Sequence, residues 1–323
     1  MLTRDLRKSF RVKNRTIEAV SGVDLSVHPR EIFGFLGPNG AGKTTTLRML
    51  TTLLPVGGGQ AVVAGLDVAR RPHEVRRRIG YVGQRGGADL PATGRENLLL
   101  QARLHGASGR EATRRAQELI ELLDLSDFAD RIVRTYSGGQ RRRLEVALGI
   151  VHRPQVLFLD EPTTGLDPQN RANLWDQLRA LRAEGTTIFL TTHYLEEADA
   201  LSDRVAIIDH GSIVAEGTPR ELKQQLAGEQ VLVKPKGPAP IEELRRQLEA
   251  QWFVEEARLE GDSIRLAVGD GGEDLPAVVD LLRRGGVQLE RISMHEPSLD
   301  DVFLSRTGRS LRDGAGEARE EVG

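Results

Sequence analysis

The sequence predicts an α/β domain followed by a small α+β domain, and three observations carry that prediction. Residues 1 to about 225 alternate strand-like and helix-like segments, the pattern of an α/β domain. A glycine-rich loop at 37–44 follows the apolar run at 32–36 and leads into a helical pattern with Leu47, Leu50 and Leu54 on one face. Loop composition at 234–240 then separates a second unit, and 323 residues are enough for both.

The loop between the first buried strand and its helix has the pattern of a phosphate-binding loop. Glycines let backbone N–H groups surround phosphate oxygens, and the following helix directs its positive end at them. In this motif Lys43 reaches the β- and γ-phosphates and the Thr44 hydroxyl ligates Mg²⁺. The expected nucleotide contacts are Gly37, Pro38, Asn39, Gly40, Ala41, Gly42, Lys43, Thr44 and Thr45.

Later segments of the first domain supply further strands. The apolar run 156–159 predicts a central parallel strand buried on both faces, and runs at 186–190 and 205–208 predict two more. Between about 89 and 150 the pattern becomes helical and charged, which predicts a helical subdomain inserted into the α/β core.

Two acidic residues end the run at 156–159. Asp160 stands where it would hold the water shell of Mg²⁺, and Glu161 where it would orient or deprotonate an attacking water. About 20 residues earlier, Ser137, Gly138, Gly139 and Gln140 precede an apolar helix face. Ser137 and the glycine amides are therefore expected to form an anion-binding helix start.

Composition excludes several classes of protein. A formal net charge of −2 provides no basic field for nucleic acid, and the lack of cysteine excludes a disulfide scaffold or thiolate metal site. No apolar run approaches the ~18 residues that span a bilayer, and the first residues do not resemble a signal peptide. These features suit a cytoplasmic protein.

The second unit is expected to contain helices near 241–251 and 275–284, a hairpin turning at Gly261-Asp262 and a strand near 287–294. Ser298 and Asp301 have the spacing of a capping box that opens a last helix over 299–304. The expected domains are thus 1–228 and 229–306, followed by a disordered Gly-, Arg- and Glu-rich tail over 307–323.

Taken in order, these motifs resemble the nucleotide-binding subunit of an ATP-binding-cassette (ABC) transporter, a P-loop NTPase. The resemblance covers residues 2 to about 225 and adds Gln84, the turn ending in Asp167, and His193 to the motifs above. Two positions depart from the family pattern: Tyr136 replaces a leucine before Ser137, and Phe10 replaces a tyrosine that stacks on adenine. Phe10 could equally be a core residue of the first strand.

The resemblance implies that Gln84 senses the metal and γ-phosphate, and that His193 contacts the γ-phosphate. It also implies that Asp167 is a nucleotide contact, and it implies a head-to-tail homodimer in which Ser137–Gln140 of one copy covers the ATP held by the phosphate-binding loop of the other. Segment 296–304 is similar to the ending of daunorubicin/doxorubicin-resistance ATPases, although it could simply pack on its own domain. The implied function is ATP-powered efflux of a hydrophobic drug or antibiotic through a separate multi-pass permease, at the cytoplasmic face of a bacterial membrane.

Other functions stay open on the sequence. The sequence of this chain does not show which type of permease it works with, so the subunit could serve lipid or polysaccharide export. A soluble ABC ATPase acting on ribosomes or DNA is less favoured, since only one cassette and no long heptad run is present. A P-loop kinase or GTPase is disfavoured by Ser137–Gln140 and by the absence of an evident Asn-Lys-x-Asp.

Overall fold

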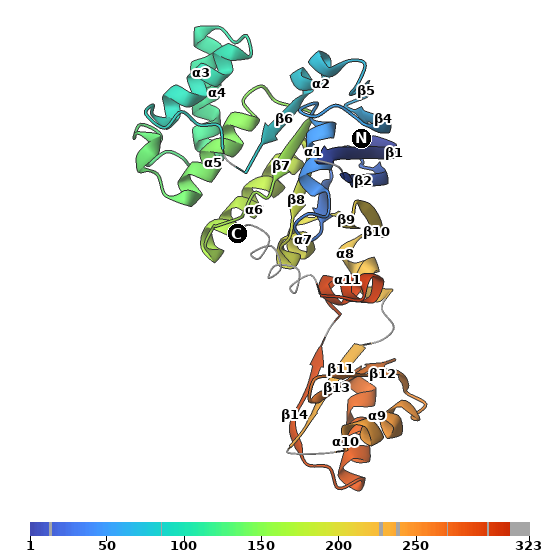
Figure 1. Ribbon diagram of the computed structural model, residues 1–323. Helices are drawn as coiled ribbons and strands as arrows, with labels where there is room; N and C mark the ends of the chain where they lie inside the picture. Colours follow the sequence, from blue (N-terminus) through green and yellow to red (C-terminus); the bar gives the residue numbers. More distant parts are fainter. Residues whose placement is uncertain are drawn as a thin grey trace. The chain divides into compact units, whose positions relative to one another are not determined.

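The computed structural model describes residues 1–12, 15–84, 86–225, 229–236, 240–269, 271–295 and 297–310. By its contacts the described chain forms two compact units, Met1–Pro219 and Arg220–Ser310 (Figure 1). The boundary expected at 228 and most of the tail expected over 307–323 lie outside the described residues. No helix within the described ranges is both long and apolar enough to cross a membrane.

A six-stranded sheet in the order β10-β9-β3-β8-β7-β6 forms the centre of the first unit. Strands β9 to β6 run parallel, and β10 pairs antiparallel with β9 at the edge. Every residue of β3, β7 and β8 is buried, as expected for strands covered on both faces. The strands are β3 (Ile32–Leu36), β6 (Ile79–Val82), β7 (Val156–Asp160), β8 (Thr187–Thr192), β9 (Arg204–Asp209) and β10 (Ser212–Gly217).

A second, antiparallel sheet in the order β2-β1-β4-β5 packs near helix α1 (Lys43–Leu50). Its strands are β1 (Leu2–Val12), β2 (Arg15–Ser26), β4 (Gly58–Val63) and β5 (Leu66–Asp67). The prediction that Leu54 belongs to the helix after the loop is wrong. The helix ends at Leu50 because the amides of Leu53 and Leu54 turn back to the Arg48 carbonyl and Thr52 adopts a φ of 62°.

Helices α3, α4 and α5 make up the predicted helical insert and gather beside β6 (Figure 1). They span Gly94–Leu104, Gly109–Leu122 and Gly138–Gly149. Each begins with a capping box, in which a Ser or Thr hydroxyl and a Glu or Gln side chain satisfy the exposed helix amides. Leu98, Leu119 and Leu144 share one apolar cluster with Leu157 and Leu159 of β7, so the insert is packed continuously onto the sheet.

Three helices and one short turn complete the first unit. They are α2 (Pro72–Arg78), the 3₁₀ turn Val133–Thr135, α6 (Pro168–Ala183) and α7 (Leu195–Leu201).

The second unit contains the sheet β12-β13-β11-β14, which is antiparallel throughout. The predicted hairpin turn at Gly261-Asp262 and the Ser298/Asp301 capping box are both confirmed. Its third helix begins at Gly271, earlier than the expected 275. The elements are α8 (Pro219–Gln224), β11 (Glu229–Pro235), α9 (Ile241–Glu249), β12 (Val254–Glu260), β13 (Ser263–Val268), α10 (Gly271–Arg284), β14 (Leu289–His295) and α11 (Leu299–Thr307).

Candidate active site

The loop at 37–42 connects the carboxyl end of β3 with the start of α1. Gly42 has a φ of 103°, and a Cβ there would come 2.3 Å from the Ala19 carbonyl, so the turn requires glycine. No side chain caps α1, which leaves its first amides facing the loop. The Lys43 Nζ folds back and donates to the carbonyls of Gly37 and Pro38 at 2.7 and 3.0 Å. The loop and the uncapped first amides of α1 form a backbone cradle that suits phosphate oxygens.

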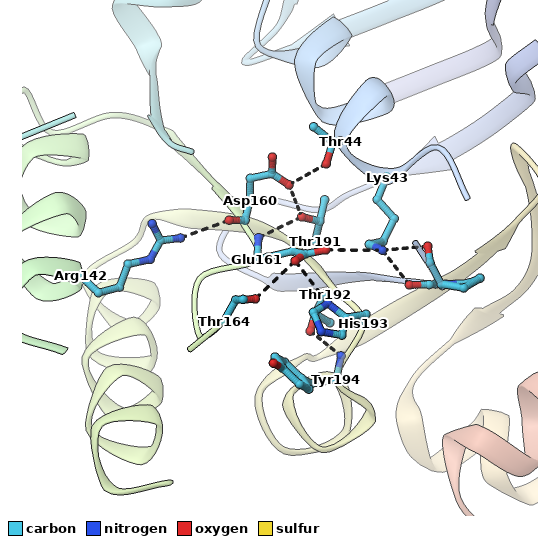
Figure 2. A network of polar contacts seen from close by, with 12 residues as sticks. Lys43, Thr44, Arg142, Asp160, Glu161, Thr164, Thr191, Thr192, His193 and Tyr194 are labelled. Atoms are coloured by element: carbon cyan, nitrogen blue, oxygen red, sulfur yellow. Dashed lines mark hydrogen bonds and ion pairs between the residues drawn. The ribbon is translucent and has the colours of Figure 1, made fainter. Parts of the chain in front are cut away.

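Of the three residues predicted at the metal, Thr44, Asp160 and Gln84, the first two lie together beside this loop (Figure 2). The Thr44 Oγ1, from α1, donates to Asp160 Oδ1 at 3.1 Å, and Thr191 Oγ1, from β8, donates to the same oxygen at 2.7 Å. The sheet register places Asp160 directly opposite Thr191. Sequence reasoning missed Thr191, although its position at the end of an adjacent parallel strand was a usable signal.

Glu161 turns from the end of β7 toward Lys43 and His193 (Figure 2). Its Oε1 lies 3.6 Å from Lys43 Nζ, and its Oε2 lies 3.3 Å from His193 Nδ1. The Thr164 hydroxyl also donates to Oε2 at 3.3 Å. Glu161 has a φ of 46°, a left-handed conformation that is costly for a residue with a side chain.

Burial and charge act against each other on both ionised groups of this pair. Burial is the largest influence on the pKa of Glu161 and raises it, but His193, Lys43 and Thr164 together bring the pKa below its ordinary value. Burial lowers the pKa of the Lys43 ammonium, and the nearby Glu161 and Asp160 only partly offset that effect. Glu161 is therefore held ionised at neutral pH, the state that a general base requires.

Gln84 follows β6 and is exposed. It lines a cavity of about 700 Å³ that also reaches Asp160, Tyr81 and Glu145. The structure thus places the predicted metal-sensing glutamine and the predicted metal-binding aspartate on the walls of one cavity.

The Ser137–Gln140 segment and Asp167 form a second group. The Ser137 Oγ accepts from the Gln140 amide at 3.2 Å, and Asp167 accepts from the Asn170 amide at 3.0 Å, so both serine and aspartate cap their own helices. Gly139 lies against Asn170, where an added Cβ would meet the amide oxygen at 2.4 Å. Across the described chain, no hydrogen bond or ion pair joins Ser137–Gln140 or Asp167 to the loop at 37–45.

Phe10 lies on β1 with 37 % of its surface exposed, and the Lys8 Nζ is 5.6 Å from the centre of its ring. The alternative that Phe10 is a core residue is therefore wrong. Its ring remains accessible for stacking on a flat ligand.

Comparison with known proteins agrees with this geometry. Residues 20–164 match the ABC transporter family, and residues 217–307 match the C-terminal domain of DrrA1-3-like ATP-binding proteins. The chain is 48 % identical over 294 residues, 90 % of each chain, to the daunorubicin resistance ATP-binding protein DrrA2 of Streptomyces coeruleorubidus. The chain belongs to the ABC transporter ATP-binding proteins.

Other relatives and solved structures agree with that assignment. The doxorubicin resistance ATP-binding protein DrrA of Mycobacterium tuberculosis is 42 % identical over 90 % of this chain and 89 % of its own. The dimeric cassette MJ0796, in a post-hydrolysis state bound to ADP and Pi, matches with a TM-score of 0.62 and 25 % identity over 67 % of this chain and 97 % of its own. The predicted fold and family are confirmed, and the protein is an ATPase of the ABC type. A kinase or GTPase function is thereby ruled out.

Proposed function

We propose that this ABC ATPase powers efflux of a hydrophobic drug or antibiotic through a separate membrane permease, at the cytoplasmic face of a bacterial membrane. The single observation that carries the chemistry is the convergence of Lys43, Glu161 and His193 beside the loop at 37–42. Support for the drug substrate comes from relatives named for daunorubicin and doxorubicin resistance, which are 42–48 % identical over about nine tenths of this chain.

In the proposed site each side chain has one task. Lys43 and the loop amides bind the β- and γ-phosphates, and Phe10 stacks on the adenine. Glu161 orients or deprotonates the attacking water, because it is ionised and adjacent to the metal-binding Asp160. His193 and Gln84 contact the γ-phosphate region. Such a reaction depends mainly on positioning and charge neutralisation, so the fixed geometry around Glu161 matters.

Mg²⁺ fits the residues that are present. Mg²⁺ is usually held by one or two protein oxygens together with substrate phosphates. Thr44 and Asp160 supply that small set, and no cluster of three or more His, Asp or Glu able to hold a metal occurs among the described residues. The metal would neutralise phosphate charge, and this chain's contribution is to hold Asp160 in place through Thr44 and Thr191.

We further propose that two copies form a head-to-tail dimer with ATP between them. Ser137–Gln140 presents a helix start, and within the described part of a single chain it makes no hydrogen bond or ion pair to the loop at 37–45. A second copy would bring the two segments together. The structurally similar MJ0796 cassette is dimeric.

A second candidate function is export of a lipid or polysaccharide. Relatives named for Nod factor export, such as that of Burkholderia thailandensis, are 42 % identical over 91 % of this chain. Two of the drug-resistance relatives are 48 % and 46 % identical to this chain, and drug efflux is therefore our first proposal.

The test is a drug-sensitivity assay in a sensitive bacterial host that carries this chain and the permease encoded beside it. Wild-type chain should lower sensitivity to an anthracycline such as daunorubicin, whereas Lys43→Ala should not, because the phosphate contact is removed. If hosts with the wild-type chain and hosts with Lys43→Ala are equally sensitive, while the purified wild type hydrolyses ATP normally, the drug is not the substrate and the ATPase assignment stays intact.

A further inference from the structure

Arg142 lies in α5, the helix that begins at Ser137, and only 7 % of its surface is exposed. Its guanidinium group donates to three backbone carbonyls from two separate segments of the chain, those of Gly83, Asp160 and Pro162, and to the Glu145 carboxylate. A buried arginine that satisfies so many acceptors fixes the relative position of the segments that carry them.

Two of these bonds enclose Glu161. Arg142 Nη2 donates to the carbonyl of Asp160 at 3.2 Å (Figure 2). Its Nε donates to the carbonyl of Pro162 at 2.8 Å, so the residues on both sides of Glu161 are held. Glu161 itself has the left-handed φ of 46°. Such a conformation persists only where the surroundings enforce it. The Glu161 amide donates to Thr191, and the Arg142 guanidinium adds a constraint from outside the strand.

The other contacts enclose Gln84. Arg142 Nη1 donates to the Gly83 carbonyl at 2.8 Å and to Glu145 Oε2 at 3.0 Å. The other Glu145 oxygen lies against Gly86, where an added Cβ would be only 1.9 Å away. The Arg142–Glu145 pair therefore touches the chain on both sides of Gln84.

We propose that Arg142 is a positioning residue for ATP hydrolysis, which holds Glu161 and the Gln84 segment in register with the helix that begins at Ser137. The proposal rests on the function proposed above, in which Glu161 and Gln84 act on the attacking water and the metal. Movement of α5 is transmitted by Arg142 to both groups, so the guanidinium couples the helix start to the hydrolytic centre. Among the described residues, Arg142 forms no hydrogen bond or ion pair with Lys43 or with the loop at 37–42, which we propose to bind the nucleotide.

The test compares Arg142→Gln with a matched control, Arg115→Gln, in the full chain. Arg115 also bonds two carbonyls, those of Ile150 and Val151, and pairs with a glutamate three residues on, but none of these groups belongs to the site. For Arg142→Gln, we expect kcat for ATP hydrolysis to fall about tenfold or more while ATP affinity changes less than about threefold. Arg115→Gln should keep both values within about twofold. Wild-type kcat in Arg142→Gln, or a loss of affinity that equals the loss of kcat, would overturn the proposal.

Further measurements separate positioning from simple destabilisation. In the Glu161→Gln background, adding Arg142→Gln should lower residual hydrolysis by clearly less than it does in the wild-type background, because one of the two groups that Arg142 positions is already lost and only the Gln84 segment is still affected. Multiplying losses would contradict the proposal. Arg142→Lys should lose kcat like Arg142→Gln, since an ammonium cannot span the same carbonyls. Full hydrolysis by the single variant Glu161→Gln would reject the catalytic role proposed for Glu161. Full hydrolysis by Arg142→Gln, with hydrolysis lost in Glu161→Gln, would reject only the positioning role of Arg142.

Removing Arg142 alone leaves the buried Glu145 with only the longer contact to Arg141, whose Nε lies 3.7 Å from Oε1, and could prevent folding. The double variant Arg142→Gln/Glu145→Gln removes both charges and is assayed in the same way, with the same expected loss of kcat. Failure of all three Arg142 variants to fold, with Arg115→Gln folded, would assign Arg142 a purely structural role and overturn the proposal.

Discussion

The Nζ of Lys43 lies 3.6 Å from Oε1 of Glu161, although the lysine is proposed to bind phosphate and the glutamate to act on water. Both side chains are largely buried, with 4 % and 10 % of their surfaces exposed. A γ-phosphate at Lys43 would compete with Glu161 for the same ammonium group. Nucleotide binding is therefore expected to release Glu161 from one of its partners and make it available to the attacking water.

Glu161→Gln should retain ATP binding and lose hydrolysis by about 10²- to 10⁴-fold, the usual contribution of a general base. The amide has the same shape but cannot accept a proton. Phosphate release and ATP affinity are measured together, with Glu196→Gln as a control because 83 % of the Glu196 side chain is exposed. Full hydrolysis by purified Glu161→Gln would reject the assigned role.

The same variant should form a homodimer that depends on ATP. Trapped, uncleaved ATP can join the loop of one copy to Ser137–Gln140 of the other, and the closed state then accumulates. Light scattering with and without Mg·ATP measures the change in mass. A mutant that stays monomeric at high concentration with ATP bound would contradict the homodimeric site.

The contribution of Glu161 to stability should depend on pH in a defined direction. Its pKa in the folded protein is lower than the ordinary value of 4.5, so ionised Glu161 stabilises the fold above that value, and the contribution is lost as the pH falls through the folded pKa. The free energy of unfolding of wild type relative to Glu161→Gln should therefore decrease from about pH 5, above the ordinary pKa, to about pH 3. Urea denaturation at both values measures it, and an increase on acidification would contradict the ion-pair geometry.

Phe303 should stabilise the second unit without serving the nucleotide site. Its side chain is 1 % exposed, and Phe→Ala in a core typically costs about 3–5 kcal/mol. Trp252→Ala is the matched control, because Trp252 is 90 % exposed and surface substitutions usually change stability by about 0.5 kcal/mol or less. We expect Phe303→Ala to unfold the unit at lower urea while ATP affinity is unchanged. A parallel fall in ATP affinity in a chain whose first unit stays folded would reject this separation of roles.

Local patterns in the sequence were sufficient for much of the site and the fold. The glycine spacing before Lys43 predicts a loop that only glycine can form, and Gly42 has the positive φ and close contact that this requires. The apolar run that ends in Asp160 predicts a strand buried on both faces, since covered parallel strands need no polar alternation. The capping boxes at Ser137 and Ser298 likewise depend on residues three positions apart, which the sequence shows directly.

Tertiary structure alone decided the contacts between distant segments. Nothing near Arg142 in the sequence indicates that its guanidinium meets carbonyls 18, 20 and 59 residues away. The exposure of Phe10 and the end of α1 before Leu54 also depended on neighbours that periodicity does not specify. The sequence by itself determined which chemical groups the protein carries and the local turns that present them. The packing of α5 against β6 and β7 determined how Glu161 and Gln84 are held, because hydrogen bonds across a fold depend on distances in space and not on spacing along the chain.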